Sequence, residues 1–180
     1  MARTRLYQDK QIDSLQQASS FVPDPNAKKK RERSRSRSQE RTARAHFDKC
    51  AREAHERLAA WKTDPNAWAG AKADHLLGLY VILHMHVYGV EPSDLLEGKT
   101  LMGATSCVRS LLRTEFLEDS RLLAEFIRWT WEQEKLTEKR FRERNEVRSF
   151  RMGWRVQFQS RSHLTSFRVA LARKIAVGSR

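Results

Sequence analysis

Apolar residues recur every three or four positions along most of this 180-residue chain, which is the spacing of amphipathic helices. Residues 40–62 show this spacing first. Residues 64–88 show it again after Asp64-Pro65, a pair that suits the start of a helix. The later half of this second segment is apolar nearly all round, so we expect it at the centre of the core, ending at Gly89.

Two more helices are predicted in the middle of the chain. One covers residues 100–118, and the next begins at Asp119 or Ser120, either of which suits an N-cap. The apolar stripe of this last helix thins beyond Glu134, while its surface becomes basic as far as residue 144. The pattern therefore predicts a helix that projects from the core with a charged far half.

The period changes to two near the C-terminus, where Trp154, Val156 and Phe158 alternate with polar residues. This alternation predicts a short extended segment. Ser162 then fits the cap of a last helix. Its inward face is expected to carry Leu164, Phe167, Leu171 and Ile175.

These elements predict a mainly α fold with a bundle-like body of four to five helices. We expect a disordered, basic, Arg/Ser-rich tail over residues 1–38, because the basic run there has no apolar residue to bury. Residues 39–134 form the predicted helical core. Residues 135–180 form a basic aromatic arm made of the helix extension, a short strand and the terminal helix. A helix beginning at Pro25, formed when the tail's charges are neutralised, is the alternative for the tail.

The net charge of +13 is concentrated at the two ends of the chain. Residues 1–44 carry 12 basic and 5 acidic side chains, and residues 135–180 carry 13 basic and 3 acidic ones. The segment between them is slightly acidic, with 10 basic and 14 acidic side chains. Such a distribution is typical of proteins that bind a polyanion.

Arginine interleaved with aromatic residues near the C-terminus favours nucleic acid as that polyanion, because guanidinium groups pair with phosphate and aromatic rings stack on bases. DNA is favoured over RNA, with contacts mainly to the backbone. The C-terminal candidates are Arg140, Arg142, Arg144, Arg148, Arg151, Trp154, Arg155, Phe158, Arg161 and Arg168. The N-terminal candidates are Lys28, Lys29, Lys30, Arg31, Arg33, Arg35 and Arg37.

Other interpretations of the basic ends stay open. The same chemistry suits RNA, and the C-terminal arm also suits an adaptor, such as a loader or assembly factor, that docks on an acidic partner protein. The Arg-Ser alternation at residues 33–38 fits a nucleic-acid arm, a nuclear-import or phosphorylation tract, or a solubilising tail. The pattern leaves the oligomeric state open.

The sequence carries no catalytic or metal-binding signature, so we expect a protein that is not an enzyme and needs no cofactor or metal. Cys50 and Cys107 are too far apart for a paired zinc site and are expected as small apolar residues on helices. His84 and His86 point about 200° apart on a helix, so one is expected inside with a hydrogen bond and the other outside.

The longest apolar run, residues 76–90, is interrupted and too short to cross a bilayer, and the first ten residues lack the apolar stretch of a signal peptide. We therefore expect a soluble intracellular protein, either cytoplasmic or nucleoid-associated, and nuclear if the host has a nucleus.

The segment Phe126-Ile127-Arg128-Trp129-Thr130-Trp131, followed by a basic helix and Gly153-Trp154-Arg155-Val156-Gln157-Phe158, resembles small uncharacterised proteins of bacteriophages and mobile elements. The resemblance covers the C-terminal third. It implies a setting in DNA metabolism, such as replication, recombination or packaging, and assigns a role to no residue.

Overall fold

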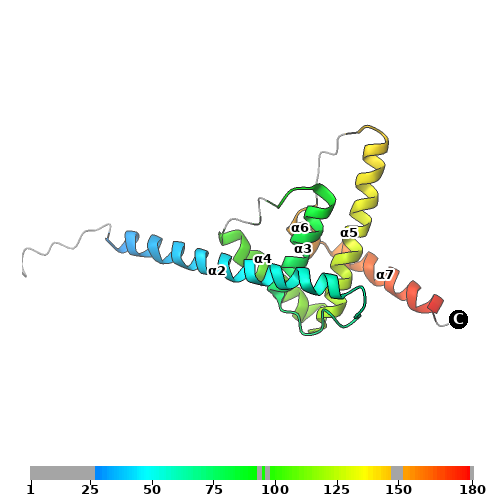
Figure 1. Cartoon of the computed structure of the whole chain (residues 1–180), viewed down its shortest axis with the longest axis horizontal. Helices are drawn as coiled ribbons and strands as arrows, with labels where there is room; N and C mark the ends of the chain where they lie inside the picture. Colours follow the sequence, from blue (N-terminus) through cyan, green and yellow to red (C-terminus); the bar gives the residue numbers. More distant parts are fainter. Residues whose placement is uncertain (1–26, 93–94, 96–97, 147–151, 179–180) are drawn as a thin grey trace, which may run out of the picture. The chain divides into compact units, whose positions relative to one another are not determined.

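The computed structural model describes residues 27–92, 95, 98–146 and 152–178. These residues form six helices and no strand, which confirms the mainly α prediction (Figure 1). The helices are α2 (Ala27–Ala60), α3 (Ala73–Tyr88), α4 (Gly98–Thr114), α5 (Ser120–Glu143), α6 (Trp154–Gln159) and α7 (Arg161–Gly178). The chain divides into a first unit, Met1–Gln39, and a second unit, Glu40–Arg180, which we call the body.

The tail prediction is wrong for residues 27–38, because all of them belong to α2. Lysine and arginine have high helix propensity, so a basic run without glycine or proline is compatible with a helix even where it has nothing apolar to bury. The remainder of the predicted tail, residues 1–26, lies outside the described residues.

Helix α3 forms the centre of the body, as its apolar sequence predicts. Its closest neighbours are α4 and α5, and a continuous run from Leu76 to Ile82 is buried. Gly78 allows α2 to approach, because a Cβ there would lie 3.0 Å from the Cβ of Ala54 and 3.1 Å from the Cα of Ala51. A side chain at position 78 would therefore require α2 to shift by a few tenths of an ångström.

The predicted start of α3 at Asp64-Pro65 is wrong, although its end is confirmed. The Asp64 carboxylate accepts a hydrogen bond of 2.8 Å from the backbone N–H of Asn66, which closes a local turn in place of a helix start. The helix begins instead at Ala73. Gly89 ends it with φ of +71° and donates its backbone N–H to the Met85 carbonyl.

The connection between α4 and α5 is tighter than the sequence indicates. Helix α4 ends at Thr114, four residues before the predicted boundary, and Leu117 and Glu118 both have positive φ. Asp119 is the N-cap of α5, because its side chain accepts from the backbone N–H groups of Arg121 and Leu122. The continuation of α5 past Glu134, as far as Glu143, is confirmed.

The predicted strand around Trp154 is wrong, since residues 154–159 form the short helix α6. Trp154 and Phe158 lie four residues apart and therefore share one helix face, which is buried. Five alternating residues fit the buried face of one helical turn as well as they fit a strand. The packing of α6 on α4 decides the outcome.

The C-terminal segment is part of the body and does not form a separate arm. Met152, Trp154, Phe158, Leu164 and Phe167 belong to the same buried cluster as α3 and α5. Helix α7 begins at Arg161, one residue before the predicted Ser162 cap. Its predicted inward face is buried only in its first half, because Ile175 is 62% exposed.

Among the described helices, none has both the length and the apolar character needed to cross a membrane.

Candidate nucleic-acid interface

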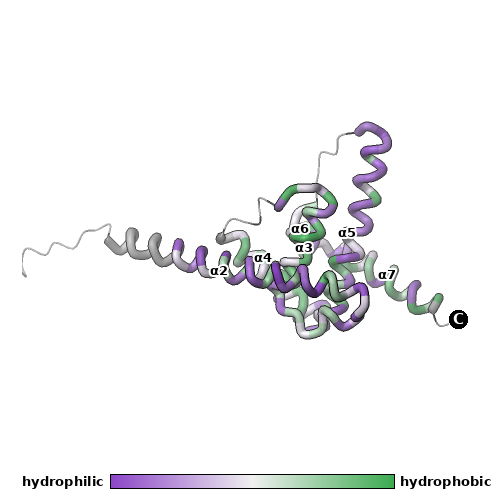
Figure 2. The backbone as a smooth tube through the Cα atoms, in the orientation of Figure 1, coloured by the Kyte–Doolittle hydropathy of each residue, from purple (hydrophilic) through white to green (hydrophobic). Residues whose placement is uncertain are grey.

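Three of the predicted arginines of the body lie close together at the end of α5, in the exposed far half of this helix, residues 135–143, and at the residue that follows it. Arg140, Arg142 and Arg144 are all exposed, and the described residues offer none of them an ion pair. Arg140 and Arg144 are four residues apart on one side of the helix, while Arg142 lies about 200° from Arg140. Figure 2 shows this part of α5 as a hydrophilic segment.

The position of these arginines at the end of a helix has an electrostatic consequence. The last carbonyl groups of α5 make its C-terminal end partially negative, which favours nearby cations. Arg140 and Arg142 lie in this last turn, so each of them is stabilised in part by the carbonyl groups of its own helix. Since both side chains remain exposed, their guanidinium donors stay available to a phosphate.

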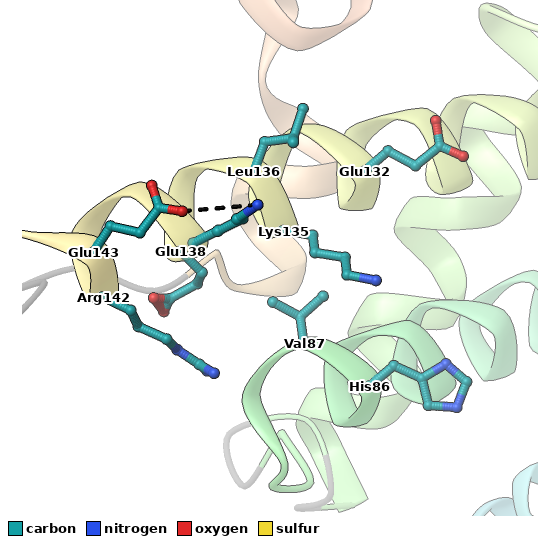
Figure 3. Close-up of a pocket in the computed structure, with 9 residues that line it drawn as sticks. His86, Val87, Glu132, Lys135, Leu136, Glu138, Arg142 and Glu143 are labelled. Atoms are coloured by element: carbon teal, nitrogen blue, oxygen red, sulfur yellow. Dashed lines mark ion pairs between the residues drawn. The ribbon is translucent and has the colours of Figure 1, made fainter.

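A groove of about 800 Å³ lies between the end of α3 and the far half of α5. Val87 on α3 and Lys135 on α5 stand on facing sides of it, and Arg142 projects at its far end (Figure 3). Glu138 and Glu143 also line it, and Glu143 forms an ion pair of 3.7 Å with Lys139. The groove thus combines both signs of charge with apolar side chains. Arg142 lines it, whereas Arg140 and Arg144 do not.

The predicted arginines of α6 and α7 differ in their availability. Arg155 is exposed, and its guanidinium carbon lies 5.3 Å from the ring centroid of Trp154. Arg161 is exposed as well. Arg168 is already engaged, because it forms an ion pair of 2.8 Å with the carboxylate of Glu115.

The two aromatic candidates for base stacking are not on the surface. Trp154 is 6% exposed and Phe158 is 4% exposed, and both belong to the core. The ring of Phe158 lies 5.6 Å from that of Tyr80, centroid to centroid. These two rings therefore cannot stack on a strand that lies along the surface, because both are packed inside the body.

The N-terminal candidates lie on the first part of α2. All seven of them fall between the bounds of this helix, Ala27–Ala60. Arg37 is exposed.

Arg148 and Arg151 lie outside the described residues.

Cys50, His46 and Asp74 lie close together and were not expected as a group. The Sγ of Cys50 is 3.6 Å from His46 Nε2, and the same nitrogen is 3.7 Å from the Asp74 carboxylate. A nucleophile–base–acid triad needs the two different ring nitrogens for these contacts. Burial raises the pKa of the Cys50 thiol, and Asp74 and Glu53 raise it further. The arrangement therefore disfavours a reactive thiolate.

The histidines of α3 have structural partners. His84 is buried, and its Nδ1 lies 2.8 Å from the Val90 carbonyl, while His86 is exposed, so the prediction of one inward and one outward histidine is confirmed. His75 accepts the backbone N–H of Lys72 through Nδ1 at 3.0 Å. Its Nε2 lies 2.7 Å from the Glu53 carboxylate. Within the described part of the chain, no group of three His, Cys, Asp or Glu residues is arranged to hold a metal ion.

Comparisons with protein-family models, with curated proteins and with solved structures gave no match.

Proposed function

We propose that this chain is a non-enzymatic protein that binds nucleic acid, most favourably DNA, through arginine contacts to the phosphate backbone. The observation that carries the proposal is the group of exposed arginines at the end of α5, Arg140, Arg142 and Arg144. The arginines have no ion pair among the described residues. A phosphate can therefore bind them without first breaking an internal salt bridge.

The remaining cations support the same partner. Arg155 and Arg161 are exposed on the body, and Arg37 is exposed on the first unit. Contacts of this kind recognise charge and carry little sequence information. Binding is thus expected to depend steeply on salt and weakly on base sequence.

The proposed setting is DNA metabolism inside the cell, namely replication, recombination or packaging, as the sequence resemblance implies. RNA remains the nearest alternative, since its backbone presents the same phosphates. Competition between DNA and RNA strands of matched sequence and length tests this choice. A preference for the DNA strand supports the proposal. A preference for the RNA strand would show that RNA is the partner instead.

A protein partner is the second candidate function, and the groove between α3 and α5 is the observation that favours it. Its mixture of apolar and charged lining residues is closer to a protein-binding surface than to a phosphate channel. Copurification distinguishes the two. An absorbance ratio at 260 and 280 nm that falls on nuclease treatment supports nucleic acid, whereas a protein that stays bound after nuclease treatment supports an adaptor.

A further inference from the structure

A second, smaller pocket of about 190 Å³ lies among α4, the start of α5, α6 and α7. Its apolar lining comes from Leu111, Phe126, Phe158 and Leu164. Pockets that hold drug-sized ligands are roughly 300–1,000 Å³. This pocket is therefore suited to one small group, such as a single planar base.

The lining of this pocket includes Gln157, whose side chain is unusual for its position. Gln157 has no exposed surface, and neither its Oε1 nor its Nε2 has a hydrogen-bond partner among the described residues. Buried polar groups in folded proteins are almost always paired, because an unpaired one loses its hydration without compensation. A carboxamide placed here without a partner indicates that it pairs with a group from outside the chain.

The chemistry of a carboxamide narrows the class of ligand. Its Nε2 donates and its Oε1 accepts, so the best complement is a planar edge with an acceptor beside a donor. The bases of nucleic acids present such edges, and the N6 and N7 atoms of adenine are the usual partners of glutamine. The apolar side chains named above suit the faces of the same ring.

The charged residues around the pocket suit a base that carries a phosphate. Arg161 lines the pocket and is exposed, so its guanidinium can reach an anion at the opening. Glu115 also lines the pocket, and its carboxylate is paired with Arg168 at 2.8 Å. That ion pair reduces the repulsion which Glu115 would otherwise exert on a phosphate.

The geometry points to a base-binding pocket in which Gln157 pairs with the edge of one adenine-like base and Arg161 contacts its phosphate. This inference rests on the proposed function, because the bound strand supplies the base. Entry requires lining side chains to move, since solvent does not reach the amide. Gln159 and Arg161 are long and exposed, which makes them the side chains able to do so.

The test compares two single-stranded oligonucleotides of equal length, one fully abasic and one with a single central adenine. The two strands have the same backbone charge, so their difference in affinity measures the base alone. We expect the full chain to bind the adenine strand about tenfold more tightly. Gln157→Leu is expected to abolish this preference. The matched control Gln133→Leu, at an exposed position on α5 outside the pocket lining, is expected to keep it.

The inference of a base-binding pocket is overturned if the unmodified chain binds both strands with equal affinity. It is also overturned if the preference for the adenine strand survives Gln157→Leu. Both results leave the proposed function intact. If neither strand binds at low salt, the proposed function fails instead, and the pocket is then tested with adenosine monophosphate. A shift of the Gln157 side-chain amide resonance with this nucleotide, and none with ribose 5-phosphate, supports the base site. The base site is overturned if adenosine monophosphate causes no shift. It is also overturned if free asparagine, which carries an amide but no base, causes an equal shift.

Discussion

Tyr88 and Glu134 are joined by a hydrogen bond in the body, with the hydroxyl of the half-buried Tyr88 donating to the buried carboxylate of Glu134. The same hydroxyl oxygen accepts the backbone N–H of Met152 at 2.8 Å. One side chain of α3 is thus bonded to α5 and to the segment that leads into α6. This contact connects the core to the residues that were predicted as a separate arm.

Removing this hydroxyl should destabilise the body. Tyr88→Phe leaves the carboxylate and the Met152 N–H without their shared partner, so we expect a loss of about 1–3 kcal/mol in the free energy of unfolding. Glu134→Gln retains an oxygen that accepts from Tyr88 and should cost less. Urea denaturation of both variants measures the difference. A larger loss for Glu134→Gln would contradict this role of the hydroxyl.

The contact between Glu53 and His75 should make stability depend on pH. The hydrogen bond from His75 holds the pKa of the Glu53 carboxyl below its ordinary value of 4.5. A lowered pKa in the folded state means that this contribution is complete above the ordinary pKa and is lost as the pH falls through the lower value.

Glu53→Gln should therefore show a shallower loss of stability between about pH 5 and about pH 3 than the unmodified chain. Thermal unfolding across this interval is the measurement. Glu56→Gln, at an exposed position three residues further along α2, provides the matched control. A slope that Glu53→Gln leaves unchanged would show that the pair contributes nothing to the folded state.

Replacing Gln157 by leucine should stabilise the chain. The substitution removes an unpaired buried amide and keeps a similar volume, so we expect a gain of about 1 kcal/mol. The unfolding midpoint in urea should rise for Gln157→Leu and stay nearly constant for Gln133→Leu, which changes an exposed glutamine on α5. A fall in the midpoint for Gln157→Leu would indicate that the amide is satisfied within the folded chain.

Phe158 should behave as a core residue. Phe158→Ala is expected to cost about 3–5 kcal/mol, as large-to-small substitutions of buried phenylalanine do. Phe158→Leu retains more of the packing and should cost less. If Phe158→Ala left the unfolding midpoint unchanged, the ring would not be packed in the core.

The sequence was sufficient to predict the helical class, the central position of α3 and the extension of α5, because each depends on a long and regular apolar pattern. It was insufficient at short segments. Residues 154–158 fit two periods equally well, and the pairing of Asp64 with Asn66 is decided by local geometry. The first is decided by the packing of α6 on α4 and the second by a hydrogen bond between a side chain and the backbone, and the spacing of apolar residues shows neither.

Some features of the candidate site follow from the sequence, and others could be found only in the structure. The basic character of Arg140, Arg142 and Arg144 follows from composition, and their exposure agrees with it. The burial of Trp154 does not follow, because an aromatic residue beside arginine is compatible with either a stacking or a packing role. The unpaired amide of Gln157 could be found only once α6 was seen as a helix packed on α4.

The salt dependence of DNA binding tests the central claim most directly. Each phosphate contact contributes roughly 0.7–0.9 to the slope of log affinity against log salt. The triple variant Arg140→Gln, Arg142→Gln and Arg144→Gln should therefore bind more weakly and show a slope shallower by about two to three. The matched control is Arg52→Gln, Arg109→Gln and Arg113→Gln, which removes the same charge from exposed positions on α2 and α4. The account predicts that this control retains nearly the full slope. Equal slopes for the two triple variants would contradict it, because the arginines at the end of α5 would then contribute no more than charge elsewhere.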